Sequence, residues 1–188
     1  MKVFDFDNTL YRGESSIDLS LFMIKKRKKI LLYLPNIFWH LLKYKLCLVE
    51  KNKLETTINR YVRSIIRDEQ EIFDLVQAFW GKNQSRLYPD MLELLDENSI
   101  ILSAGPRFLL EGIQSRLRTR HLVCTEIDLK KKEILYFNFG RNKVVRYHEL
   151  YGDQTINRFY TDSYNDQAMI DLADEAYLVK NGEPKRIK

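Results

Sequence analysis

Two aspartates, Asp5 and Asp7, stand near the start of the chain and are followed by the hydroxyl of Thr9. The alternation of apolar and polar types over residues 2–6 predicts a short buried strand, so these polar groups come where that strand ends. On one strand, positions five and seven point to the same side, so both carboxylates could face one bound group. Such a pair can divide the work of a nucleophile and a general acid-base group.

Further polar groups follow two other predicted strands. Ser103 comes directly after the apolar run 99–102, and Asp162 and Asp166 come after the extended segment 157–161. In an open parallel sheet the ligand site forms at the carboxyl ends of the strands, so we expect four aspartates to meet at one edge. Such a cluster repels itself unless a hard cation binds there, and Mg²⁺ prefers oxygen ligands. Together with a lysine and hydroxyl groups, this site would suit phosphoryl transfer.

The second half of the chain alternates between predicted strands and helices. Extended segments are expected at 99–102, 121–125, 133–139, 157–161 and 175–179. Helices are expected between them, the first of them opened by Pro106 as a first helical residue and running to about Leu117, the others near 142–150 and 165–173. This alternation predicts an α/β fold with a parallel sheet.

The segment from about residue 17 to residue 84 has a different pattern. It contains almost no glycine, and its apolar residues recur at helical spacing: Leu54, Ile58, Val62, Ile65, Ile72, Val76, Phe79 and Trp80. This spacing predicts several helices packed on one another. We therefore expect a core formed by residues 1–12 and 86–188 and an all-helical insertion, a cap, formed by residues 13–85.

The motifs in this order resemble those of the haloacid dehalogenase superfamily. Residues 5–9 (DFDNT) resemble its DxDxT signature, and Ser103, a later lysine and residues 162–166 (DSYND) match its other three motifs. Residues 123–143 further resemble the branch typified by phosphoserine phosphatase, which carries its helical cap just after the first motif. The resemblance implies a Rossmann-like three-layer fold and a Mg²⁺-dependent phosphatase that hydrolyses a small phosphomonoester through an aspartyl-phosphate.

The resemblance also implies roles for the residues that transfer the phosphoryl group. Asp5 would be the nucleophile and a metal ligand, and Asp7 the general acid-base group, with its backbone carbonyl on the metal. Lys143 would neutralise charge on the phosphoryl group and on Asp5, and it is chosen over neighbouring basic residues because it follows residues 140–142 at the start of a helix. We expect Mg²⁺ and Lys143 to keep the pKa of Asp5 low.

Phosphate and metal binding are assigned in the same way. Thr9, Ser103 and the adjacent Ala104 would bind phosphoryl oxygens, while Asp162 would ligate Mg²⁺ with support from Asp166, directly or through water. The fourth motif departs from the Gly-Asp-Gly usual in phosphoserine phosphatases, because residues 161–163 read TDS here. The identity of the substrate is therefore not carried over.

Glu14 allows two interpretations. It lies nine residues after Asp5, where phosphoserine phosphatases use an acid to hold the amino group of the substrate. It could equally be an acid that leads a helix, next to two serines. Nothing else in the cap indicates a substrate.

Charge limits the partners. The formal net charge is +5, and the run Lys25–Lys29 alone holds five basic side chains, so the basicity is local. This pattern favours a solvated helix face over a nucleic-acid surface, and it leaves open a weak contact with an anionic surface. A lipid-like phosphate substrate, phosphoryl transfer to an acceptor other than water, and a non-catalytic binding module remain as alternatives.

Composition points to a protein inside the cell. The acids at Asp5 and Asp7 interrupt any apolar leader, which argues against a signal peptide and for a cytoplasmic location. The apolar stretch 30–49 contains Pro35 and several polar and basic residues, so no membrane span is expected. Two distant cysteines suggest reduced thiols rather than a disulfide. The oligomeric state cannot be read from the sequence.

Overall fold

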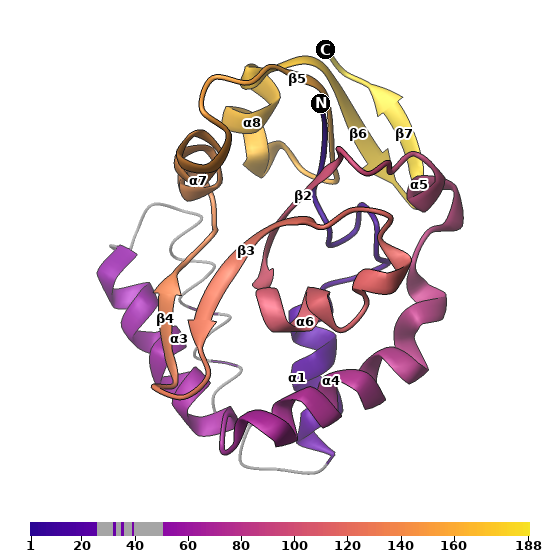
Figure 1. The fold of residues 1–188 in the computed structure, drawn as a ribbon. Coiled ribbons are helices and arrows are strands. Elements are labelled where there is room, and N and C mark those ends of the chain that lie inside the picture. Colours follow the sequence, from indigo (N-terminus) through magenta and orange to yellow (C-terminus); the bar gives the residue numbers. More distant parts are fainter. Residues whose placement is uncertain (26–31, 33–34, 36–38, 40–50) are drawn as a thin grey trace.

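The computed structural model describes residues 1–25, 32, 35, 39 and 51–188, apart from the side chains of residues 51–55 (Figure 1). Its centre is a seven-stranded sheet with the order β4-β3-β2-β1-β5-β6-β7. The strands are β1 Lys2–Phe4, β2 Ile100–Pro106, β3 His121–Asp128, β4 Glu133–Tyr136, β5 Ile156–Thr161, β6 Ala173–Lys180 and β7 Glu183–Arg186. The five central strands run parallel, and the edge strands β4 and β7 pair antiparallel to their neighbours.

Helices cover both faces of this sheet. Successive strand residues point to opposite faces, and both faces carry apolar side chains that the helices bury. Val3 and Leu102 pack on one side with Tyr147 of α7 (Arg141–Tyr151) and Met169 of α8 (Gln167–Leu172). Phe4 and its neighbours on the other side pack with buried residues of α5 (Pro89–Glu93), α6 (Arg107–Glu111) and α4 (Glu69–Asn83). The α/β three-layer architecture predicted from the sequence is therefore confirmed.

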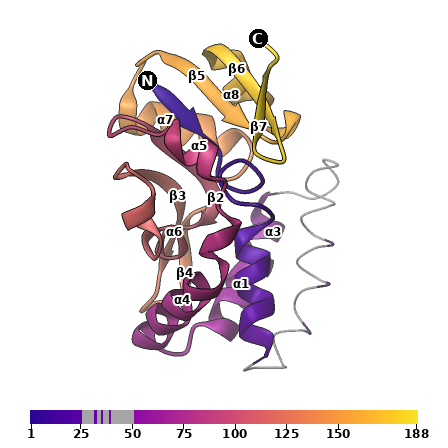
Figure 2. The same cartoon turned by 90° about the vertical axis from the view of Figure 1, so that its right-hand side faces the viewer.

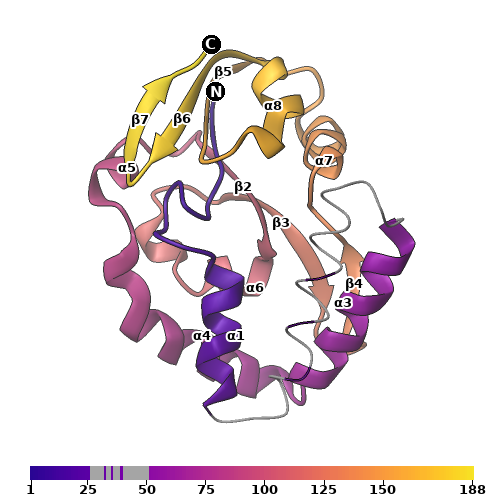
Figure 3. The same ribbon diagram turned by 180° about the vertical axis from the view of Figure 1, so that it is seen from behind.

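From Ser15 to Arg86 the chain is mostly helical where it is described. It contains α1 (Ser15–Ile24), α3 (Lys51–Ile65) and α4, followed by the short 3-10 turn Gln84–Arg86. Of the eight apolar positions predicted from helical spacing, six are buried in one core: Val62, Ile65, Ile72, Val76, Phe79 and Trp80. Ile58 packs against this core and is partly buried, and the side chain of Leu54 lies outside the described residues. Figures 2 and 3 show α1, α3 and α4 gathered beyond the carboxyl end of β1. The division into a 13–85 cap and a two-part core stays a prediction.

An aromatic cluster fixes the loop after β1 against this helical segment. The rings of Phe6 and Tyr11 are stacked with centroids 6.0 Å apart, and Trp80 of α4 meets Tyr11 edge-on at 5.5 Å. The indole Nε1 of Trp80 donates a hydrogen bond of 2.7 Å to the carbonyl of Leu109 in α6. The loop that carries Asp5, Asp7 and Thr9 is thus held between β1 and two helices.

Several element boundaries differ from the prediction. β1 ends at Phe4, so Asp5 and Asp7 do not lie on one strand as expected. β2 continues to Pro106, which is the N-cap of α6 and not its first helical residue, because its backbone is extended (φ −70°, ψ 141°). The predicted helix to Leu117 ends at Glu111 and is followed by the 3-10 turn Gln114–Arg116.

Two predicted features of the polypeptide fall partly or wholly outside the described residues. Of the basic run Lys25–Lys29, only Lys25 is described, and it is the C-cap of α1. Cys47 is not described, and Cys124 is a buried free thiol on β3. In the part of the chain that is described, no helix is long and apolar enough to cross a membrane.

Candidate active site

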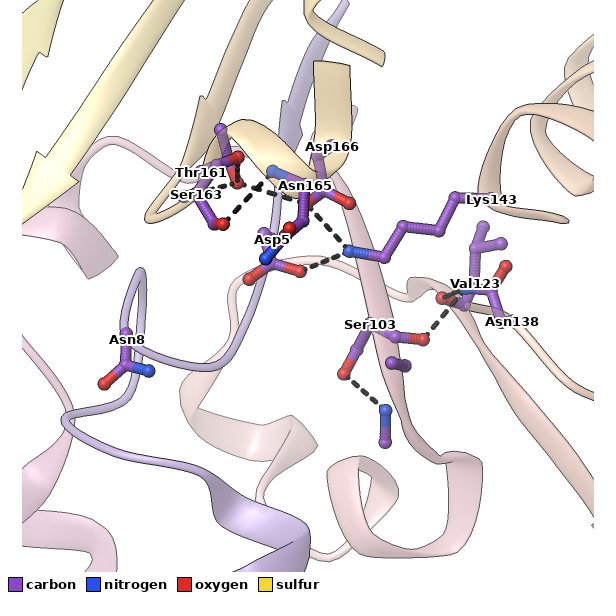
Figure 4. A network of polar contacts seen from close by, with 12 residues as sticks. Asp5, Asn8, Ser103, Val123, Asn138, Lys143, Thr161, Ser163, Asn165 and Asp166 are labelled. Carbon is purple, nitrogen blue, oxygen red and sulfur yellow. Dashed lines mark hydrogen bonds and ion pairs between the residues drawn. The ribbon is translucent and has the colours of Figure 1, made fainter. Parts of the chain in front are cut away.

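Three charged side chains from distant parts of the chain meet at the carboxyl edge of the sheet. The ammonium of Lys143 donates to Oδ1 of Asp5 at 2.7 Å and to Oδ2 of Asp166 at 2.9 Å (Figure 4). All three side chains are at most one-tenth exposed. A buried charge is strongly destabilising unless an opposite charge lies close to it. The two carboxylates therefore fix the position of the Lys143 ammonium.

Each of these side chains has a clear structural origin. The amide of Asp5 donates to the carbonyl of Tyr160 at 2.8 Å, which continues the β1–β5 ladder one residue beyond the strand. Lys143 is the third residue of α7, whose N-cap Gly140 has a positive φ of 58° that favours glycine. Asp166 ends a single 3-10 turn after β5, and Ser163 caps that turn by accepting from the amide of Asn165.

Thr161 adds a fourth member to this cluster. Its hydroxyl donates to Oδ2 of Asp166 at 3.1 Å, the same oxygen that accepts from Lys143. Asp166 therefore contacts Lys143 directly in the structure, and its predicted support of a metal stays a prediction. Thr161 was not singled out from the sequence, although its position directly before Asp162 is where this chain departs from the Gly-Asp-Gly pattern.

Asp7 is placed by a turn and not by a strand. The amides of residues 9–11 all donate to the carbonyl of Phe6, and Asn8 has a positive φ of 56°. Oδ1 of Asp7 accepts a 2.7 Å hydrogen bond from the amide of Ser15 at the start of α1. Burial raises the pKa of Asp7 to about 7, while hydrogen bonds from Ser15 oppose the rise and the charge of Glu14 adds to it.

Burial acts on the buried ion pair as well. It raises the pKa of Asp5 well above its ordinary value, against the charge of Lys143, and the charge of Asp166 adds to the rise. Burial alone would lower the pKa of Lys143, but Asp5 and Asp166 together raise it above its ordinary value. The low pKa predicted for Asp5 is thus not produced by the protein groups, because burial outweighs the charge of the ammonium that Asp5 shares with Asp166.

The hydroxyls of Thr9 and Ser103, both predicted to bind phosphate, differ in their hydrogen bonds. The hydroxyl oxygen of Thr9 is buried and has no hydrogen-bond partner among the described residues, and its role in binding a phosphoryl oxygen stays a prediction. The hydroxyl of Ser103 accepts from the amide of Gly105 at 3.0 Å and keeps its own proton for donation. Ala104 follows Ser103 on β2, and its carbonyl accepts from Thr125 at 2.7 Å.

Glu14 lies at the solvent side of this site. It is exposed, one of its carboxylate oxygens accepts from Nδ2 of Asn8 at 3.1 Å, and its charge acts on Asp7. It is the N-cap residue of α1, without a capping hydrogen bond from its side chain, so it does lead a helix as one of the two interpretations expects. The sequence-based role in holding a substrate group stays a prediction.

Asp162 is a further acidic group at this edge that could ligate a metal ion. Asp162 is partly buried after β5, and burial, then the charge of Asp166, raises its pKa. Within the described residues, no group of three or more His, Cys, Asp or Glu side chains is arranged to hold a metal ion. Mg²⁺ commonly binds through one or two carboxylates, with carbonyl and water oxygens completing its shell. Four carboxylates with one ammonium leave an excess of negative charge, so the donor set fits a hard cation bound in that way.

Comparison with known proteins identifies the class. A family model described as haloacid dehalogenase-like hydrolase matches residues 3–171. The chain therefore belongs to the haloacid dehalogenase-like hydrolases, and the prediction of an enzyme of this family is confirmed. A search of curated proteins finds no match.

Solved structures share the fold at low sequence identity. A protein of unknown function from Bordetella pertussis Tohama I has a TM-score of 0.77 at 15% identity, covering 94% of this chain and 87% of that chain. A phosphoserine phosphohydrolase-like protein from Francisella tularensis has a TM-score of 0.62 at 18% identity, covering 94% of this chain and 86% of that chain. A HAD family hydrolase from Salmonella enterica serovar Typhi has a TM-score of 0.60 at 14% identity, covering 91% and 58%. These similarities show that the chain shares its fold with these three proteins.

Proposed function

We propose that this chain is a Mg²⁺-dependent phosphatase that hydrolyses a small phosphomonoester through an aspartyl-phosphate on Asp5. The observation that carries the proposal is the contact of the Lys143 ammonium with Asp5 and Asp166 at the carboxyl edge of the sheet. A fixed positive charge beside a carboxylate suits a reaction in which that carboxylate attacks an anionic phosphoryl group. Family membership and the intact pair of Asp5 and Asp7 favour this function over a non-catalytic binding module.

The first half of the reaction forms the covalent intermediate. Lys143 binds Oδ1 of Asp5, so Oδ2 is the oxygen that attacks phosphorus in line with the leaving oxygen. The bond from phosphorus to the ester oxygen breaks, and Asp7 gives its proton to that oxygen. The hydroxyls of Thr9 and Ser103 and the ammonium of Lys143 bind the equatorial phosphoryl oxygens while charge develops on them.

The second half restores the enzyme. Asp7, now ionised, takes a proton from a water molecule as that water attacks phosphorus. The bond between phosphorus and Asp5 breaks, inorganic phosphate leaves, and both carboxylates return to their starting states. The amide of Ser15 holds Asp7 in one orientation through the cycle, because it donates to Oδ1 at 2.7 Å.

Asp5, Asp162 and the backbone carbonyl of Asp7 would hold Mg²⁺, with Asp166 supporting Asp162. When bound, the cation supplies charge neutralisation for the transferring phosphoryl group. The excess of carboxylates over ammonium groups at this edge supports the assignment. The Glu14 carboxylate, exposed and close to Asp7, would contact the part of the substrate beyond the phosphate.

A magnesium-dependent screen tests the proposal. The panel should contain phosphoserine, sugar phosphates, nucleotides and lysophosphatidates, with p-nitrophenyl phosphate as a general activated ester. Release of inorganic phosphate from at least one small ester, dependent on added Mg²⁺, is the expected result. Turnover of lysophosphatidates alone would favour a lipid-like substrate, and no release from any ester would contradict the proposed function.

A further inference from the structure

β2 leaves its regular pairing with β3 at Ser103 and Ala104, both predicted to bind phosphate, and we call this irregular segment the turn at Ser103. Leu102 of β2 faces Val123 of β3, but the next paired residues are Pro106 and Thr125. From Leu102 to Pro106 β2 advances by four residues while β3 advances by two, so the backbone of residues 103–105 bulges out of the ladder. Such a bulge re-aims side chains and leaves carbonyl groups without ladder partners.

Two buried side chains bind the carbonyls that the bulge releases. Nδ2 of Asn138 donates to the carbonyls of Ser103 and Val123, each at 2.8 Å, and so bridges β2 and β3 (Figure 4). The hydroxyl of Thr125 donates to the carbonyl of Ala104 at 2.7 Å. The amide of Asn138 in turn donates to that hydroxyl at 3.1 Å, so the two side chains form one network.

The segment that contains Asn138 leads directly into α7, the helix that carries Lys143. Asn138 precedes Lys143 by five residues, and Nδ2 of Asn142 donates to the carbonyl of Phe137 at 2.7 Å. The amide of Lys143 donates to the carbonyl of Gly140 at 3.1 Å. The network therefore connects the turn at Ser103 to the lysine on the other side of Asp5.

We propose that Thr125 and Asn138 are positioning residues, which hold the backbone of Ser103 and Ala104 in the conformation that binds the phosphoryl group. The inference rests on the proposed phosphatase function. The hydrogen bonds of both side chains go to the backbone of β2 and β3 and not to Asp5, so each would act through the turn and not on the substrate. A turn displaced by a fraction of an ångström would lose transition-state contacts while the fold persists.

Thr119 offers a matched control at the opposite end of the same strand pair. Its buried hydroxyl donates to the carbonyl of Ser99 at 2.5 Å and accepts from the amide of His121 at 3.1 Å. Thr125 is buried to the same degree and makes the same two kinds of hydrogen bond. Replacing either threonine with valine removes an equivalent hydroxyl, but only one of them is next to the turn.

The experiment compares Thr125→Val, Thr125→Ser, Asn138→Ala and Thr119→Val in steady-state hydrolysis of p-nitrophenyl phosphate, with urea unfolding of each variant. We expect Thr125→Val and Asn138→Ala to lower kcat by about tenfold to a hundredfold and to change KM by less than about threefold. Thr125→Ser should restore kcat, and Thr119→Val should lose similar stability and keep kcat. Wild-type kcat in a folded Thr125→Val or Asn138→Ala protein, or an equal loss in Thr119→Val, would overturn the proposal.

A second readout separates this inference from the proposed function. If the wild type hydrolyses no ester, the proposed function fails, and calorimetric binding of inorganic phosphate in the presence of Mg²⁺ replaces kcat. Binding to Thr125→Val that is about tenfold weaker than binding to Thr119→Val would support the positioning role. Equal binding, or no phosphate binding by the wild type, would overturn it.

Discussion

Nζ of Lys143 lies 2.7 Å from Oδ1 of Asp5, although 138 residues separate them in the chain. Both side chains are buried, and Asp166 binds the same ammonium from the other side. This contact joins the first and third motifs of the sequence into one charged unit.

Lys143→Met should lower kcat by at least about a hundredfold, because the transferring phosphoryl group loses a preorganised positive charge. Lys143→Arg should not restore the rate, since a planar guanidinium cannot replace a compact ammonium between two carboxylates. The measurement is steady-state hydrolysis of p-nitrophenyl phosphate by proteins shown to be folded by circular dichroism. Lys131→Met, which changes an exposed lysine, is the control, and an equal loss of activity in that variant would contradict the assignment.

Asp162→Ala should abolish magnesium-dependent turnover, and EDTA should do the same to the wild type. The reason is that the variant loses the only direct carboxylate ligand proposed besides Asp5. The measurement is the rate as a function of added Mg²⁺, with Asp153→Ala as a control because that side chain is fully exposed. Full activity of Asp162→Ala, or of EDTA-treated enzyme without added metal, would exclude the proposed metal role.

Trp80→Phe should lower the free energy of unfolding by about 1–3 kcal/mol, since it leaves the carbonyl of Leu109 without its buried donor. The indole is 3% exposed and donates to that carbonyl at 2.7 Å. Urea unfolding measures the change. Phe73→Leu on the same helix, where the ring is 39% exposed, should shift the free energy by less than about 0.5 kcal/mol. Equal midpoints for the wild type and Trp80→Phe would show that the link between α4 and α6 contributes nothing.

Much of this arrangement follows from local sequence patterns. The alternation of strands and helices predicted that Asp5, Ser103 and Asp162 would follow parallel strands, and strand ends of a parallel sheet meet at one edge. Lys143 was selected because it follows a glycine at a helix start, and the structure places its ammonium on Asp5. These features depend on short-range propensity and on the general rules of sheet topology.

Other features depend on hydrogen bonds between distant segments, which no local pattern specifies. The turn at residues 6–9 ends β1 early, so Asp7 is oriented by the amide of Ser15 and not by strand alternation. Asn138 lies in an apolar run that reads as a strand, and only the bulge in β2 explains a polar side chain there. All four residues of the edge strand β7 are exposed, and the strand lacks the apolar alternation that would have predicted it.

The central claim is that Asp5 and Asp7 have different functions although they are two residues apart. Asp5→Asn should abolish turnover and form no covalent phosphate, because an amide is not a nucleophile toward phosphorus. Asp7→Asn should still be phosphorylated by an activated ester with a good leaving group, since its amide oxygen can accept from Ser15 as the carboxylate does. It should release that phosphate slowly, because the attacking water lacks its base.

Trapping of the phosphoenzyme with a labelled activated ester, followed by peptide mass spectrometry, tests this claim most directly. The expected result is label on Asp5 alone, in the wild type transiently and in Asp7→Asn for much longer. Label on any other residue, or normal turnover by Asp5→Asn, would contradict the proposed mechanism.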